Sequence, residues 1–168
     1  ELSHEIDYLR WIFGEVEAVQ GWLGHIGPLE LDVEDTVHAL LHFGCSVPKG
    51  HEGAAPVANL TLDFIRRDPV RRCVAIGDEG TLEWDGIASR VRQFGPDGEI
   101  QLLHDQKPSR DTSYSLQIEA FVNCVTTAAP PAIGINDGLA VLKIVEAIRR
   151  SHDQGGHQVS LANGQGGT

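Results

Sequence analysis

The strongest constraint on the fold is a series of short apolar segments in the middle of the chain, separated by very short turns. The segments cover residues 70–76, 81–85, 88–94 and 99–103, and glycine, aspartate and proline fill the turns between them. Strands joined by such turns pair antiparallel, because a parallel crossover needs a dozen or more residues. The middle of the chain is therefore predicted to form an antiparallel meander.

Further strands are predicted upstream of this meander. Residues 15–22 have strand composition, and residues 35–43 and 57–66 alternate apolar and polar side chains. In the second of these segments, one face carries Val37, Ala39, Leu41 and Phe43, and the other carries Thr36, His38, Leu40 and His42. In the third, Ala58, Leu60, Leu62 and Phe64 share a face. One face of the sheet is thus expected to form a core and the other to be half polar.

Helices are predicted at the start and toward the end of the chain. The first covers residues 3–13, with Ser3 as its N-cap, Gly14 as its stop and an inward stripe of Ile6, Leu9 and Phe13. Residues 113–127 show a helical stripe of Tyr114, Ile118, Phe121, Val122 and Val125. A last helix begins near Asn136 or Asp137 and places Leu139, Leu142, Val145 and Ile148 inward. This order of elements predicts an α+β fold, with helices packed on one face of an open, mainly antiparallel sheet.

Length, charge and cysteine content limit the classes of function that we expect for this chain. The 168 residues predict one domain, and the formal net charge of −11 repels nucleic acids and anionic membrane surfaces. No apolar run or signal sequence indicates membrane insertion or export. Three cysteines without CxxC spacing predict neither disulfides nor a zinc site, and in their apolar surroundings we expect buried, inert thiols in a reducing cytoplasm. They are Cys45, Cys73 and Cys124. The chain has no methionine and begins with Glu1, so we expect it to be either processed or cut from a longer protein.

His4 is the leading candidate for chemistry. It lies in the first turn of the predicted helix, where the positive end of the helix dipole favours a neutral imidazole that can accept a proton. Asp7 follows three residues later on the same side and could orient the ring or a substrate. From these residues alone, a surface or packing role for His4 is the more common alternative. Tyr8 stands where a zinc-binding HExxH helix needs its second histidine.

Other polar groups leave their alternatives open. His38 and His42 would lie about 13 Å apart on a strand, so a metal site that combines them with His51 is not expected. Arg66, Arg67, Arg71 and Arg72 flank the turn at Pro69 and form either an anion site or a solvated hairpin tip. The glycine-rich residues 164–168 are expected to be a frayed end rather than a phosphate loop, since no strand precedes them closely and no helix follows.

Several stretches resemble, in the right order, one known domain. Residues 1–16, ELSHEIDYLRWIFGEV, resemble the segment that opens the C-terminal domain of the glucose-fructose oxidoreductase/inositol dehydrogenase (Gfo/Idh/MocA) family. VEDT at residues 33–36 resembles the start of that domain's second strand, and IGDEGTLEWD at residues 76–85 resembles its glycine turn. DGLAVL at residues 137–142 and EAIRRS at residues 146–151 resemble its closing helix. The resemblance covers nearly the whole chain.

The resemblance implies a function for a longer parent protein. Family members place an NAD- or NADP-binding Rossmann domain before such a domain, so residues 1–168 are expected to be the single C-terminal domain, with no cofactor-binding residue of their own and no metal site. His4 is similar to the family histidine that exchanges a proton with a sugar hydroxyl, Asp7 matches a common companion, and Tyr8 is expected to bind substrate with it. The parent is expected to oxidise or reduce a sugar or a sugar derivative, nucleotide-linked sugars included, and the fragment alone to be inactive.

The same resemblance implies assembly, since the family's open sheet mediates oligomerisation. We therefore expect a homo-oligomer that forms through the half-polar sheet face, and the residues expected there are Thr36, Leu40, Asn59, Thr61 and Ile65. The alternative hypothesis is a stand-alone α+β interaction domain that dimerises through this face and has no catalytic role.

Overall fold

The computed structural model describes residues 2–30, 32–44, 55–106, 109 and 111–161. Some of the predictions from the sequence fall outside the described residues. They concern Cys45, His51 and residues 164–168. The chain divides into two compact units, one made of Glu1–Ile65 with Ala132–Thr168 and the other of Arg66–Pro131. The prediction that all 168 residues form one C-terminal domain stays a prediction.

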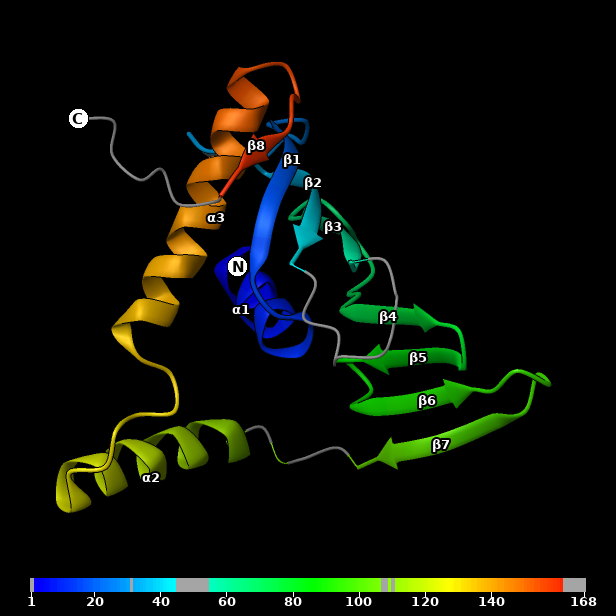
Figure 1. Ribbon diagram of the computed structural model, residues 1–168, viewed down its shortest axis with the longest axis vertical. Coiled ribbons are helices and arrows are strands. Elements are labelled where there is room, and N and C mark those ends of the chain that lie inside the picture. The colour runs from blue at the N-terminus through cyan, green and yellow to red at the C-terminus, as the bar shows by residue number, and fades with distance from the viewer. Residues whose placement is uncertain (1, 31, 45–54, 107–108, 110, 162–168) are drawn as a thin grey trace. The chain divides into compact units, whose positions relative to one another are not determined.

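The first unit is a four-stranded antiparallel sheet with two helices. Its strand order is β3-β2-β1-β8, and α3 runs beside β1 (Figure 1). The elements are α1 (Leu2–Phe13), β1 (Val16–Gly24), β2 (Thr36–Phe43), β3 (Val57–Asp63), α3 (Ile135–Asp153) and β8 (Val159–Ser160). Strands β1, β2 and β3 begin and end close to the predicted positions, β8 was not predicted, and the antiparallel α+β class is confirmed.

Alternation along the strands separates the two faces of this sheet. Side chains that face the helices are buried, and they include Val19, Leu23, Ala39, Leu41 and Phe43. The opposite face, which we call the outer face, exposes Trp22, His38, Leu40, Asn59 and Thr61. The helices α1 and α3 therefore cover one face of the sheet, as predicted. Thr36 and Ile65 are corrections, because Thr36 is buried and Ile65 is half-buried beyond the end of β3.

Helix α3 packs through a stripe that shares Ile148 with the predicted one and differs in its other residues. Val141, Ile144, Ala147 and Ile148 are buried, whereas Leu139 and Leu142 are 50% and 61% exposed. The helix approaches β1 closely at Ile148, because Gly21 has no side chain and leaves room for Ile148 against the strand. The predicted start is also corrected. Gly134 is the N-cap, and the Asp137 carboxylate accepts its backbone N–H at 2.8 Å.

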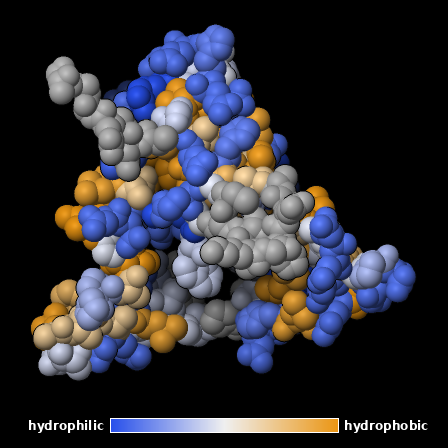
Figure 2. All heavy atoms as spheres, viewed as in Figure 1, coloured by the Kyte–Doolittle hydropathy of each residue, from blue (hydrophilic) through white to orange (hydrophobic). Residues whose placement is uncertain are grey.

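The second unit contains the predicted meander and one helix. Strands β4 (Arg72–Gly77), β5 (Gly80–Asp85), β6 (Arg90–Phe94) and β7 (Ile100–Asp105) pair in chain order, and α2 covers Thr112–Thr127. Figure 2 shows apolar residues gathered over α2, and none of the side chains of this helix is buried. Among the described residues of this unit, only Glu83 has a buried side chain. The predicted helical stripe exists, but it is exposed.

Candidate functional site

Helix α1 presents the predicted site residues on its solvent side. His4 is exposed, and Asp7 and Tyr8 are half-buried one turn further along the helix. Residues three and four apart are neighbours on a helix surface, so the fold brings all three onto one face. Ser3 is a correction, because the helix begins at Leu2 and Ser3 therefore lies inside the first turn rather than at the cap.

Apolar packing on the other side holds this face in place. Ile6 and Leu9 are 0% and 4% exposed, and the ring of Phe13 lies 5.7 Å from the ring of Phe43 on β2. The helix ends at Gly14, whose φ of 93° suits glycine and whose N–H donates to the carbonyl of Arg10 at 2.9 Å. These contacts attach α1 to the sheet and leave its polar side open.

Arg10 fixes α1 against α3. Its Nη2 and Nε donate to the Glu15 carboxylate at 2.6 and 3.1 Å, and its Nη1 donates to the carbonyl oxygen of Asp137 at 3.3 Å. The hydrogen bond to Glu15 is the largest cause of the raised pKa of Arg10, and the negative charges of Asp137 and Asp7 act in the same direction. The guanidinium is thus a permanent positive charge beside the carboxylate of Asp7.

This face can perform acid–base chemistry on a bound hydroxyl. An exposed imidazole can accept or return a proton, and a carboxylate and a phenol one turn away can hydrogen-bond a polar substrate. The sequence predicted these three residues together, and the structure places them on one helix face. Their catalytic and substrate-binding roles stay predictions.

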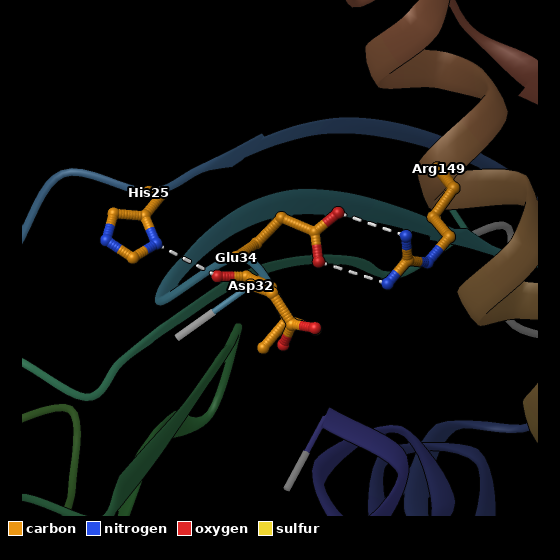
Figure 3. Close-up of a pocket in the computed structure, with 5 residues that line it drawn as sticks. His25, Asp32, Glu34 and Arg149 are labelled. Atoms are coloured by element: carbon orange, nitrogen blue, oxygen red, sulfur yellow. Dashed lines mark hydrogen bonds and ion pairs between the residues drawn. The ribbon is translucent and has the colours of Figure 1, made fainter. Parts of the chain in front are cut away.

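A second polar group of the first unit was not predicted from the sequence. It lines an open pocket between the start of β2 and α3, formed by His25, Asp32, Val33, Glu34 and Arg149 (Figure 3). Both nitrogens of the Arg149 fork donate to the Glu34 carboxylate at 3.0 Å. The N–H of His25 Nδ1 donates to the Val33 carbonyl at 3.1 Å. Because Glu34 pairs with Arg149 and His25 with the Val33 carbonyl, we assign these four residues a structural role, which is to tie the β1–β2 loop to α3.

Asp35, part of the VEDT stretch, anchors the same loop. Its carboxylate is buried and accepts N–H bonds from Ile26 at 3.0 Å and from Gly27 at 2.7 Å, and the hydroxyl of Thr36 donates to it at 2.9 Å. The bond from Ile26 is the largest cause of the lowered pKa of Asp35. Gly27 is required at this turn, because a Cβ there would lie 2.2 Å from Ile65 Cγ2 and 2.9 Å from Asp35 Oδ2.

The basic residues around Pro69 lie in the second unit, and Arg66, Arg71 and Arg72 contact neighbouring side chains. Arg72 of β4 and Arg92 of β6 each donate to one oxygen of the buried Glu83 carboxylate, and Arg92 is the larger cause of the lowered pKa of Glu83. The guanidinium of Arg71 lies 5.3 Å from the ring centre of Trp84. Arg66 donates to Asp68 at 3.4 Å. An anion site at this cluster stays a prediction.

The remaining candidate residues that the structure describes do not form one cluster. His38 and His42 lie on the outer-face side of β2, and the Nδ1 of His38 is 3.2 Å from the hydroxyl oxygen of Thr61. Within the described ranges, no group of three or more His, Cys, Asp or Glu side chains could hold a metal ion. The prediction of buried thiols is wrong for Cys73 and Cys124, which are both half-buried.

Comparison with known proteins decides the family. Residues 1–161 match the model of the oxidoreductase family C-terminal alpha/beta domain of the Gfo/Idh/MocA type. The chain belongs to this family. No curated protein matches the sequence. In the part of the chain that the structure describes, no helix is both long and apolar enough to cross a membrane.

Solved structures share the fold of this Gfo/Idh/MocA domain. Aldose-aldose oxidoreductase from Caulobacter crescentus, solved with glycerol, is 23% identical, with a TM-score of 0.74 over 95% of this chain and 45% of that one. WlbA dehydrogenase from Bordetella pertussis, solved with NADH and UDP-GlcNAcA, is 22% identical, with a TM-score of 0.68 over 96% and 45%. An oxidoreductase from Agrobacterium radiobacter, solved with NAD⁺, L-tartaric acid and magnesium, is 18% identical, with a TM-score of 0.70 over 94% and 47%. The chain thus spans about half the length of the solved structures it matches.

Proposed function

We propose that this chain is the substrate-binding and assembly half of an NAD(P)-dependent oxidoreductase that acts on a sugar or a sugar derivative. The observation that carries the proposal is the polar face of α1, on which His4, Asp7 and Tyr8 lie together in a domain of an oxidoreductase family. The proposal concerns the full-length protein, and the 168-residue chain by itself is expected to be inactive.

In this mechanism His4 is the proton acceptor. Oxidation of a secondary alcohol removes a hydride from carbon and a proton from oxygen, and the exposed imidazole takes that proton or returns it in the reverse direction. Asp7 and Tyr8 hydrogen-bond neighbouring hydroxyls and hold the reacting one against His4. The packing of Ile6 and Leu9 keeps the helix, and with it the imidazole, in a fixed position.

The described part of this chain does not fit a dinucleotide. Every strand pair that it forms is antiparallel, whereas a Rossmann site needs parallel strands and a glycine-rich turn that opens a helix. We therefore place the nicotinamide cofactor in a separate half of the parent protein. When bound there, it supplies the hydride acceptor or donor.

The ligands of the similar structures support a polyhydroxylated substrate. Glycerol, L-tartaric acid and UDP-GlcNAcA all carry hydroxyl groups next to carbon-bound hydrogen. The similar structures also include a UDP-N-acetylglucosamine 3-dehydrogenase from Acidithiobacillus ferrooxidans. This group supports sugars and nucleotide-linked sugars as the class to test first.

The outer face of the sheet is proposed to pair two copies of the chain. Exposed side chains from three neighbouring strands form it, and they combine apolar and hydrogen-bonding groups: Trp22, His38, Leu40, Asn59 and Thr61. A sheet face that mixes apolar and hydrogen-bonding side chains is suited to a self-complementary interface. If this face were the only functional surface, the protein would be an interaction domain without catalysis.

Turnover by the full-length protein separates the two functions. The full-length protein and the 168-residue chain are assayed with NAD⁺ and NADP⁺ against myo-inositol, D-glucose and UDP-N-acetylglucosamine, and reduced nicotinamide is followed by absorbance. We expect turnover of at least one sugar by the full-length protein and none by the chain alone. Self-association of the full-length protein without turnover of any sugar would instead support the interaction domain.

A further inference from the structure

Trp11 is the most exposed aromatic side chain on the helix that carries the proposed site. Its exposed fraction is 85%, whereas the other aromatic side chains of α1, Tyr8 and Phe13, are half-buried. Placing an indole almost wholly in water stabilises no fold, since the apolar ring gains nothing from burial there. The exposed ring of Trp11 is therefore available to contact a ligand.

Trp11 lies almost directly in line with His4 along the helix. At about 100° per residue, the seven positions between them amount to nearly two full turns, so the two side chains leave the helix within about 20° of each other. Asp7 and Tyr8 flank this line, and the buried residues Ile6 and Leu9 lie on the opposite side. The exposed stripe of α1 thus runs from a proton acceptor, through two hydrogen-bonding groups, to an aromatic ring.

The spacing suits a ligand the size of a sugar. A separation of seven residues is about 10 Å along the axis, and side chains on a helix lean toward its N-terminus, which brings the indole back toward the turn of Asp7 and Tyr8. A sugar ring offers one or both faces of carbon-bound hydrogens and a rim of hydroxyls. An aromatic surface beside a carboxylate, a phenol and an imidazole matches these two parts, because small-molecule sites combine aromatic walls with a few placed polar groups.

We propose that Trp11 is a substrate-binding residue that stacks against the carbon–hydrogen face of the sugar whose hydroxyl reacts at His4. This inference rests on the proposed function and names the surface that recognises the sugar ring. Stacking holds the ring while Asp7 and Tyr8 select its hydroxyls. Because the indole contributes to binding and not to proton transfer, its loss acts on the KM for the sugar rather than on kcat.

The test compares three variants of the full-length protein, using the sugar of the above panel that gives the highest turnover. Trp11→Ala removes the stacking surface, Trp11→Phe keeps an aromatic ring, and Ile12→Ala is the matched control. Ile12 is the next residue, is 52% exposed and points about 100° away from the line of His4. Both positions are exposed in α1, so folding of the three variants is expected to survive, and thermal unfolding checks this directly.

We expect Trp11→Ala to raise the KM for the sugar about tenfold with kcat within about twofold of wild type. Trp11→Phe should recover most of the affinity, Ile12→Ala should leave KM unchanged, and the Kd for NADH should be the same in all variants. An unchanged KM in Trp11→Ala overturns the inference, and so does a weaker Kd for NADH, which would mean that Trp11 packs against the cofactor-binding half.

The failure of this inference is distinguishable from the failure of the proposed function. Loss of turnover in His4→Ala together with an unchanged KM in Trp11→Ala overturns the stacking role alone. Absence of turnover with every sugar of the panel overturns the proposed function and the stacking role with it.

Discussion

Replacement of Gly21 by alanine is predicted to destabilise the first unit. Gly21 lies on β1 beneath α3, and a Cβ at this position would lie 2.6 Å from Ile148 Cγ2 and 3.0 Å from the Ile148 carbonyl oxygen. The preferred separation of nonbonded carbon atoms in proteins is about 3.5–4.0 Å, and both contacts are short enough to be repulsive. The helix would have to move away from the strand to accept the methyl group.

Neighbouring contacts make that movement costly. Ile148 is 0% exposed, and one turn along α3 the hydroxyl oxygen of Ser151 accepts the N–H of Gly21 at 2.9 Å while the hydroxyl donates to the carbonyl of His157 at 2.7 Å. A shift of α3 would stretch both hydrogen bonds as well as loosen the apolar packing. An inserted methyl group in a packed core costs about 1–3 kcal/mol, and we expect Gly21→Ala to fall in the upper part of that range.

Urea denaturation of the full-length protein measures this cost, and Gly138→Ala is the matched control. Gly138 lies in the same α3, and a Cβ there would meet nothing within 4 Å. Alanine is a better helix former than glycine by about 1 kcal/mol, so this variant should be more stable than wild type. Opposite signs for the two substitutions are predicted. A neutral or stabilising Gly21→Ala would refute the packing of α3 on β1 described above.

Further substitutions test three other features. The pKa of Asp35 is lowered in the folded state, so its ionised carboxylate stabilises the fold above the unfolded-state pKa of about 4, and this stabilisation is lost as pH falls through the folded-state pKa. Asp35→Asn should therefore unfold at lower urea concentration near neutral pH, and the difference from wild type should shrink in acid. Glu83→Gln removes the shared carboxylate of Arg72 and Arg92 and should speed amide hydrogen exchange in β5, whereas Asp105→Asn at an exposed ion pair should have little effect. Leu40→Lys on the outer face should shift the full-length protein toward monomers in sedimentation, and an unchanged distribution would count against that face as the interface.

The short turns made the sheet of β4 to β7 predictable, because a turn of two to four residues leaves no alternative to antiparallel pairing. In the other sheet, alternation assigns the faces of β2 from its own residues. The pairing of β8 with β1 was not predicted, because a strand of two residues carries no period. Its position depends on the buried Ser151, which joins the strand to the end of α3.

The sequence predictions are wrong where a residue far away in the sequence determines which side chains are buried. Helix α3 carries two apolar stripes that share Ile148, and its packing against β1 buries the one with Val141 and Ile144 rather than the one with Leu142. Likewise, Glu83 is buried because arginines from both neighbouring strands neutralise it. Neither partner can be recognised from the residues next to these positions.

The candidate site was predictable in part because it lies on one helix. Residues three and four apart share a face whatever the tertiary structure, so His4, Asp7 and Tyr8 could be grouped from their spacing. The polar group around Glu34 and Arg149 could not, because 115 residues separate the two side chains in the sequence. The exposure of Trp11 was likewise visible only once the buried side of α1 was known.

The central claim is that His4 exchanges a proton with the substrate of a nicotinamide-dependent oxidoreductase. The most direct test measures kcat and the Kd for NADH in His4→Ala of the full-length protein, with His104→Ala, an exposed histidine of β7, as control. We predict that His4→Ala lowers kcat by about two to four powers of ten and leaves the Kd for NADH unchanged, while His104→Ala keeps wild-type turnover. Wild-type turnover in His4→Ala would contradict the claim and remove His4 from the mechanism.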